Sequence, residues 1–121
     1  MKEVLIVDDS EQIRQRLVTL LAESSQIRIV GQAGDSREAL EALQRLRPDT
    51  VILDIRLPGT SGIELLKEIK ARYPEMTVIM LTNFDYALYR RQCRQLGADH
   101  FLNKTLEFEK IVDTIMDRSA Q

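Results

Sequence analysis

The chain has 121 residues, a net charge of −2 and a hydrophobic fraction of 44%, which together suit one compact domain with an ordinary core. This charge balance is not the basic footprint of a nucleic-acid-binding surface or of a polybasic membrane anchor. No apolar run is long enough to span a bilayer, and residues 1–3 lead straight into a strand-like run rather than a signal peptide, so we expect a cytoplasmic protein. With one cysteine, Cys93, and one histidine, His100, neither an internal disulfide nor a Cys/His zinc site can form.

Strand and helix patterns alternate through the first half of the chain. Nearly continuous apolar runs over residues 4–7, 27–33 and 51–53 predict strands that are buried on both faces. Ser10 and Asp35 are the predicted N-caps of the helices after the first and second strands. The apolar stripes of these two helices are Ile13, Leu17, Leu20 and Leu21, then Ala39, Leu43 and Leu46.

The second half continues the same alternation. Ser61 is the predicted N-cap of a third helix, residues 77–81 and 100–102 read as strands, and Gly97 is the predicted C-terminal cap of the helix between them. Helical spacing of apolar residues defines the last three helices. Their stripes are Leu65, Leu66 and Ile69, then Tyr86, Tyr89, Cys93 and Leu96, then Phe108, Ile111, Val112, Ile115 and Met116.

Five successive strand–helix units predict a parallel sheet with helices on both faces. We therefore expect a single α/β domain over residues 1–121, a five-stranded (βα)5 sandwich. For the strand order we take 2-1-3-4-5, the order of known flavodoxin-like folds, since the residues alone do not give it. In this order the first and third strands lie side by side. Open α/β sheets of this kind bind ligands at the carboxyl ends of the strands, near the point where the strand order reverses.

Polar residues follow four of the predicted strands at that edge: Asp8 and Asp9, Asp54, Thr82, and Lys104. Carboxylates ~4 Å apart repel by about 1 kcal/mol per pair in water, and by more where solvent is reduced. The acidic cluster therefore predicts a bound cation. Mg²⁺ suits hard oxygen ligands best, and Mn²⁺ is an alternative ion. A carboxylate can also attack phosphorus, with the lysine and the threonine hydroxyl available to the phosphoryl oxygens.

The whole chain resembles the receiver (CheY-like) domain of bacterial two-component response regulators. The residues that carry the resemblance are Asp8 and Asp9, Asp54 with Pro58 and Gly62 after it, Thr82, and Phe101 three residues before Lys104. The resemblance implies that Asp54 accepts a phosphoryl group from a sensor histidine kinase or a phosphotransfer protein. It also implies that the domain is not a multiple-turnover enzyme, because it catalyses only its own phosphorylation and dephosphorylation.

Further site roles follow from the same resemblance. Asp9, Asp54 and the backbone carbonyl of Arg56 would bind Mg²⁺ directly, and Asp8 would act mainly through water. Lys104 would pair with the phosphoryl group.

The resemblance also implies a switch. Thr82 would move toward the phosphoryl group and Phe101 would turn inward. These movements would remodel the face made by the fourth helix, fifth strand and fifth helix, which would contact an output domain or an effector protein. A homodimer that forms on phosphorylation is a further implication.

Some positions depart from the family pattern. Asn83 stands where the family usually has a small residue, and Thr105 stands where proline is common. Arg56 and Phe84 lie two residues after the phosphoacceptor and the switch threonine. We interpret Arg56, Asn83 and Phe84 as residues that tune the lifetime of the phosphorylated state.

The sequence leaves alternatives open. The domain could be a receiver-like interaction module that is never phosphorylated. An aspartyl-nucleophile phosphatase fits less well, because Asp8 and Asp9 are adjacent rather than in an Asp-x-Asp pattern and no cap insertion is present. A flavin or nucleotide module would need a glycine-rich phosphate loop that the sequence lacks. A stand-alone receiver and the receiver of a longer DNA-binding regulator are not separated.

Three arginines make the fourth predicted helix basic: Arg90, Arg91 and Arg94. We interpret them as a solvated face. Their place on the expected signalling face makes contact with a partner the alternative.

Overall fold

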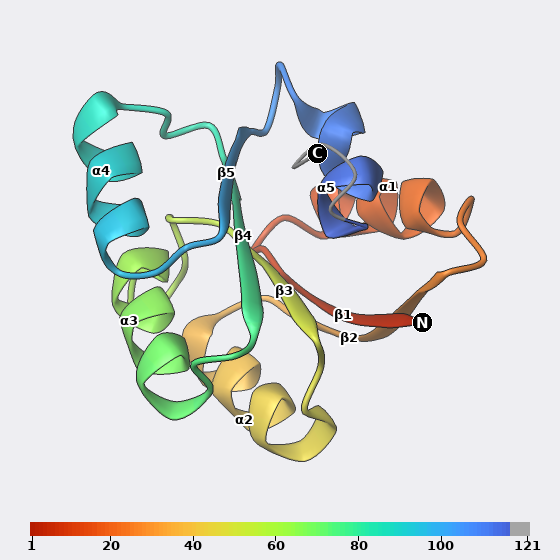
Figure 1. Ribbon diagram of the computed structural model, residues 1–121, viewed down its shortest axis with the longest axis horizontal. Helices are drawn as coiled ribbons and strands as arrows, with labels where there is room; N and C mark the ends of the chain where they lie inside the picture. Colours follow the sequence, from red (N-terminus) through yellow and green to blue (C-terminus); the bar gives the residue numbers. More distant parts are fainter. Residues whose placement is uncertain (117–121) are drawn as a thin grey trace.

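The computed structural model describes residues 1–116 of the chain (Figure 1). Its elements are β1 (Lys2–Val7), α1 (Glu11–Leu21), β2 (Ile27–Ala33), α2 (Ser36–Leu46), β3 (Thr50–Leu53), α3 (Gly62–Arg72), β4 (Thr77–Thr82), α4 (Ala87–Gln95), β5 (His100–Asn103), the 3₁₀ helix η1 (Phe108–Lys110) and α5 (Ile111–Ile115). The five strands form one parallel sheet in the order β2-β1-β3-β4-β5. The predicted fold class and strand order are confirmed.

Helices cover both faces of the sheet (Figure 1). One apolar cluster lies between the sheet and α1 with α5, and the other lies between the sheet and α2, α3 and α4. Successive strand residues point to opposite faces, so Val4 and Ile6 join the first cluster while Leu5 and Val7 join the second. This two-sided burial is the reason the strands are continuously apolar.

The predicted caps of the first three helices are confirmed. The side chains of Ser10, Asp35 and Ser61 each accept a hydrogen bond from the amide three residues later, at 3.2, 2.8 and 3.3 Å. Gly97 follows α4 with a φ of +101°, which is the left-handed conformation expected of a glycine at a helix C-terminus. Each cap fixes where a helix leaves or rejoins the sheet edge.

Two stretches differ from the sequence prediction. Tyr86 is not on the inward stripe of α4, because the helix begins only at Ala87 and Tyr86 occupies the extended cap position with 62% exposure. Residues 108–110 form a 3₁₀ turn rather than the start of an α-helix, since Lys110 donates its amide to the carbonyl of Glu107. Phe108 is nevertheless buried, so the apolar pattern identified the packing although not the hydrogen bonding.

Within residues 1–116, no helix combines the length and the apolar character that crossing a membrane would require.

Candidate functional site

The backbone holds the predicted site residues at the carboxyl edge of the sheet. Asp8, Asp54 and Lys104 each lie just past the end of a strand. Their amides donate to carbonyls of neighbouring strands at 3.0, 3.3 and 2.9 Å, so the parallel ladder continues for one more residue. The site residues are therefore fixed by the same hydrogen bonds that build the sheet.

Lys104 lies between two carboxylates. Its Nζ is 2.7 Å from Oδ2 of Asp8 and 2.5 Å from Oδ2 of Asp54. The three side chains are only 10%, 4% and 6% exposed. One positive charge thus faces two negative charges in a place that water scarcely reaches.

Burial and hydrogen bonds act in opposite directions on the pKa values of this cluster. Burial raises the pKa of Asp8 above its ordinary value, although hydrogen bonds from Lys104 and the Ser10 amide act in the opposite direction. Burial works to lower the pKa of Lys104, but its hydrogen bonds to Asp54 and Asp8 outweigh this effect and raise it. The two carboxylates thus favour the charged form of the lysine, whereas burial disfavours the charged form of Asp8.

The third predicted carboxylate is not part of the buried cluster. Asp9 is exposed, and among residues 1–116 no three Asp, Glu, His or Cys side chains are arranged to hold a metal ion. The structure therefore brings together two of the three predicted carboxylates. The ammonium group of Lys104, rather than a third carboxylate, completes the buried cluster.

The predicted switch residues flank this cluster. Thr82 is fully buried, and its Oγ1 accepts a hydrogen bond from the Phe84 amide at 3.1 Å. Phe101 is partly buried in β5, and the guanidinium carbon of Arg90 lies 4.7 Å from the centre of its ring. Both residues thus lie on segments adjoining the site, with the threonine hydroxyl engaged by its own loop.

The positions interpreted as rate-tuning also lie around the site. Arg56 places its guanidinium carbon 5.2 Å from the centre of the Phe84 ring, which joins the loops after β3 and β4. The Asn83 side-chain oxygen accepts a hydrogen bond from the hydroxyl of Thr105 at 2.8 Å. This second bridge connects the loops that follow Thr82 and Lys104.

Gly62 packs directly against the backbone of the candidate nucleophile. A Cβ at this position would lie 1.9 Å from the carbonyl oxygen of Asp54. The Gly62 amide donates to the carbonyl of Ile55 at 2.6 Å. Only glycine allows this approach, so α3 begins against the end of β3.

Sequence reasoning missed several residues around the site. Arg14 donates to the backbone carbonyl of Asp8 at 2.6 Å. Arg91 and Arg94 are exposed, as a solvated face requires, whereas Arg90, with 39% of its side chain exposed, also pairs with Asp85 and approaches Glu107. These partners lie outside the i,i+3 and i,i+4 spacings that mark helical pairs, so no sequence signal could have identified them.

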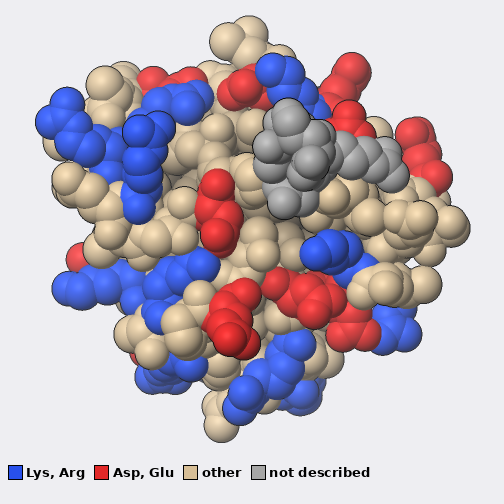
Figure 2. Space-filling view, viewed as in Figure 1, with Lys and Arg blue, Asp and Glu red and all other residues tan. Residues whose placement is uncertain are grey.

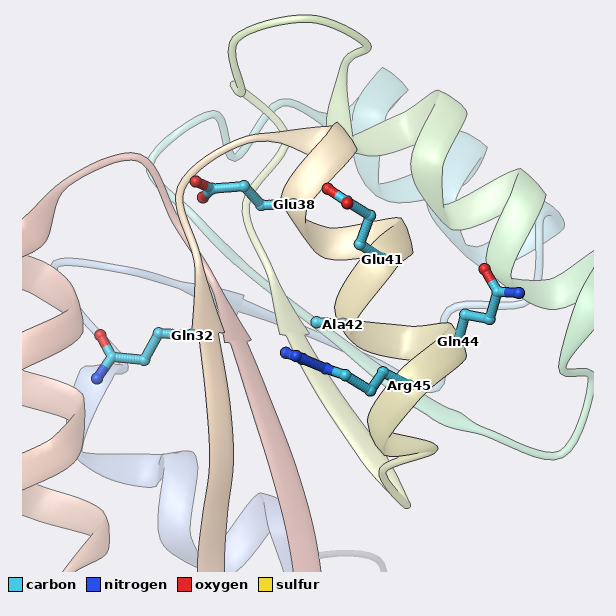
Figure 3. A pocket seen from close by; sticks show the side chains of 6 residues that line it. All are labelled: Gln32, Glu38, Glu41, Ala42, Gln44 and Arg45. Atoms are coloured by element: carbon cyan, nitrogen blue, oxygen red, sulfur yellow. The ribbon is translucent and has the colours of Figure 1, made fainter.

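A hollow of about 680 Å³ lies beside α2 and β2. Figure 3 shows its lining side chains, which come from α2 and, for Gln32, from β2. None of the predicted site residues lines it. Its walls mix Glu38, Glu41 and Arg45 with amides, which gives no chemistry related to the carboxyl edge.

Comparison with known proteins identifies related chains. The model of the response regulator receiver domain matches residues 4–116. DevR/DosR of Mycobacterium tuberculosis, described as a DNA-binding transcriptional activator, is 32% identical over 120 residues, which cover 99% of this chain and 55% of that protein. An uncharacterized response regulatory protein of Vibrio cholerae is 38% identical over 116 residues, which cover 95% of this chain and 47% of that protein. The chain spans about half the length of these curated relatives.

Solved structures show the same fold. The response regulator domain of Thermotoga maritima CheB matches with a TM-score of 0.85 and 30% identity, covering 100% of this chain and 95% of that one. A chain of the CheX–CheY–BeF3–Mg²⁺ complex from Borrelia burgdorferi matches with a TM-score of 0.90 and 28% identity, covering 99% of this chain and 90% of that one.

Proposed function

The chain belongs to the receiver-domain family of two-component response regulators, and on that premise we propose that Asp54 is its phosphoacceptor. The observation that carries the proposal is the buried cluster in which Lys104 contacts both Asp54 and Asp8 at the carboxyl edge. An oxygen of Asp54 attacks the phosphorus of a phosphohistidine, the P–N bond breaks, and the imidazole takes up a proton. Water later attacks the phosphorus, the new P–O bond breaks, inorganic phosphate leaves and the Asp54 carboxylate is restored.

The donor set of the site fits Mg²⁺, with Mn²⁺ as an alternative. Asp8 and Asp54 are buried carboxylates with one lysine between them, so one negative charge is left over, and Mg²⁺ is commonly held by one or two carboxylates together with waters. Asp9 and the backbone carbonyl of Arg56 would add further hard oxygen ligands. A bound Mg²⁺ would neutralise charge on the phosphoryl oxygens. The Mg²⁺ and BeF3 named with the Borrelia burgdorferi CheY complex support this assignment.

The chain's own residues carry the remaining roles in the proposal. Lys104, already held charged beside Asp54, pairs with a phosphoryl oxygen. Thr82 exchanges its hydrogen bond with the Phe84 amide for one to the phosphoryl group. Phe101 then turns into the space that the threonine leaves. Phosphorylation adds about −1.5 to −2 charges, which biases the equilibrium between two conformations.

Three residues set the lifetime of the phosphorylated state in this proposal. Arg56 and Phe84 contact each other across the loops after β3 and β4. Asn83 is exposed next to the switch threonine, where its size restricts the approach of small donors or of water.

The phosphodonor is a sensor histidine kinase or a phosphotransfer protein. The output passes through the face made by α4, β5 and α5 to an output domain or effector protein, or to a second copy of the chain. Direct binding to DNA is not proposed for this domain, although DevR/DosR is described as DNA-binding as a whole protein. A receiver-like module that is never phosphorylated, or a phosphatase, is the outcome if the chemistry fails.

The test is intact-protein mass after incubation with acetyl phosphate, with and without Mg²⁺. Wild type, Asp54→Asn and Asp49→Asn are compared. Asp49 lies at the opposite end of β3, where it accepts the Glu3 amide, so it is a matched aspartate remote from the site. We expect one added phosphoryl group in wild type and Asp49→Asn, dependent on Mg²⁺, and none in Asp54→Asn.

Failure to label the folded wild type with acetyl phosphate and with a phosphorylated histidine phosphotransfer protein would contradict the proposal. Labelling of Asp54→Asn would move the acceptor elsewhere. Continuous release of phosphate from a small phosphate ester would instead favour a phosphatase.

A further inference from the structure

A second positively charged side chain, that of Arg90, lies between two carboxylates next to the carboxyl edge of the sheet. Arg90 of α4 donates to both carboxylate oxygens of Asp85, with Nη2 3.0 Å from Oδ2. The same Nη2 is 3.7 Å from Oε1 of Glu107. The guanidinium also lies over the ring of Phe101. One side chain therefore contacts the loop after β4, the strand β5 and the segment before η1.

Asn103 extends this network to the site. Its side-chain nitrogen donates to Asp85 at 3.3 Å, and its backbone amide donates to Glu107 at 2.9 Å. Its side-chain oxygen accepts from two amides of the turn that follows, both at 2.9 Å. Asn103 directly precedes Lys104, and Asp85 is three residues after Thr82. The network thus ties together the two segments that carry the phosphoryl-binding lysine and the switch threonine.

We propose that Arg90 is a positioning residue of the switch, holding Phe101 and the loop after β4 in the arrangement of the unphosphorylated domain. The inference rests on the proposed function. The Thr82 hydroxyl is engaged by the Phe84 amide, and Phe101 lies under Arg90. A movement of Thr82 toward the phosphoryl group displaces the loop that carries Asp85, and an inward turn of Phe101 removes the ring from the guanidinium. Contacts that exist in one state only shift the equilibrium toward that state.

The electrostatics support a specific pair. The hydrogen bond from Arg90 lowers the pKa of Asp85, and the same bond raises the pKa of Arg90. The fork of the guanidinium engages both carboxylate oxygens while its face covers an aromatic ring, a combination that a lysine ammonium does not reproduce. Arg90 is therefore suited to hold the loop after β4 and the Phe101 ring together, whereas a lysine would supply only its charge.

Another arginine of the same helix, Arg91, serves as the control. Figure 2 shows basic side chains gathered over α4. Arg91 is exposed, and within residues 1–116 it forms no ion pair. Arg91→Ala therefore removes the same charge from the same helix without touching the network.

The test uses BeF3⁻ with Mg²⁺ as a phosphoryl analogue on the complete chain. Wild type, Arg90→Ala, Arg90→Lys and Arg91→Ala are first compared by amide NMR without ligand. In Arg90→Ala, the β5 and α4 amides are expected to shift from the wild-type positions toward those of the BeF3⁻-bound form. Arg90→Ala is then expected to bind BeF3⁻ about three- to tenfold more tightly than wild type, because a larger fraction of the variant already has the conformation that binds BeF3⁻.

The amide shifts and BeF3⁻ affinity of Arg90→Lys are expected to lie between those of wild type and Arg90→Ala. Those of Arg91→Ala are expected to match wild type. Combining Arg90→Ala with Asp85→Asn should add less than the two single effects together, because they remove the same interaction. Unmoved amides or equal affinity in Arg90→Ala, with a responsive wild type, would overturn the inference and leave the proposed function intact. Weaker binding would assign Arg90 to the active state and overturn it as well. A wild type that responds to neither BeF3⁻ nor acetyl phosphate would contradict the proposed function instead.

Discussion

Two clusters in this domain have the same balance of charges and different exposure to water. Lys104 lies between Asp8 and Asp54 with side chains 4% to 10% exposed. Arg90 lies between Asp85 and Glu107 with side chains 23% to 39% exposed. Each places one cation between two carboxylates near the carboxyl ends of the strands, and the clusters differ most in how far water reaches them.

Burial changes the sign of the carboxylate's response. It raises the pKa of Asp8 despite the lysine beside it, whereas the hydrogen bond from Arg90 lowers the pKa of Asp85 because water still reaches that pair. The buried cluster has excess negative charge that a further cation would relieve. The Arg90 cluster has the same excess of one negative charge, but its side chains are partly exposed and water screens that charge. The buried Lys104 cluster is suited to our proposed binding of a metal ion and a phosphoryl group. The partly exposed Arg90 cluster is suited to a contact that can break when the loop after β4 and strand β5 move.

The largest effect is expected from Lys104→Met, measured as the urea-unfolding free energy at neutral pH with divalent ions removed. Removing the cation leaves two buried carboxylates facing each other, which should lower stability by about 3 kcal/mol. Lys110→Met is the control, because Lys110 is 67% exposed and its contact with Glu107 is long, at 3.4 Å. A Lys104 effect no larger than that of Lys110 would refute the importance of burial.

Gly62→Ala tests whether the backbone at the junction of β3 and α3 is rigid, with the midpoint of denaturation as the measured quantity. The added methyl would meet the Asp54 carbonyl, and relief of that clash should cost about 2 kcal/mol. Gly34→Ala is the matched control, since its added carbon would meet only flexible side-chain ends at 3.3 Å and beyond. Equal denaturation midpoints for the two variants would show that the β3–α3 junction yields easily.

Arg90→Ala should have a smaller effect on stability than Lys104→Met. Its ion pairs are partly exposed, and screening leaves about 0.2–1 kcal/mol for such a contact. The difference from wild type should shrink between 0.05 and 1 M NaCl, concentrations chosen to span weak and strong screening. A loss above that range, unaffected by salt, would mean that this cluster behaves as a buried one.

Asp85→Asn should change the pH dependence of stability in a defined direction. The folded-state pKa of Asp85 is lowered, so the aspartate contributes stability above its unfolded pKa and loses it as the pH falls through the folded pKa. Wild type should therefore lose stability relative to Asp85→Asn as the pH falls through the acidic range. Parallel profiles in thermal melts from neutral pH down to pH 3 would contradict the pairing with Arg90.

The sequence by itself determined the strands and placed Asp8, Asp54, Thr82 and Lys104 at their carboxyl ends, whereas the strand order was taken from known folds of this type. Strands buried on both faces must be apolar throughout, and parallel strands bring their carboxyl ends to one edge. Local hydrogen bonds make the caps readable as well, since Ser10 and Ser61 act on amides only three residues away.

Only the tertiary structure decided which of those residues meet and how water reaches them. Asp9 stays exposed while its neighbour Asp8 is buried, and Lys104 reaches a carboxylate 50 residues earlier in the chain. Arg90 finds partners on two other segments, which its helical spacing could not indicate. The physical reason is that a residue type sets its charge and reach, whereas burial and partners across the fold set what that charge does.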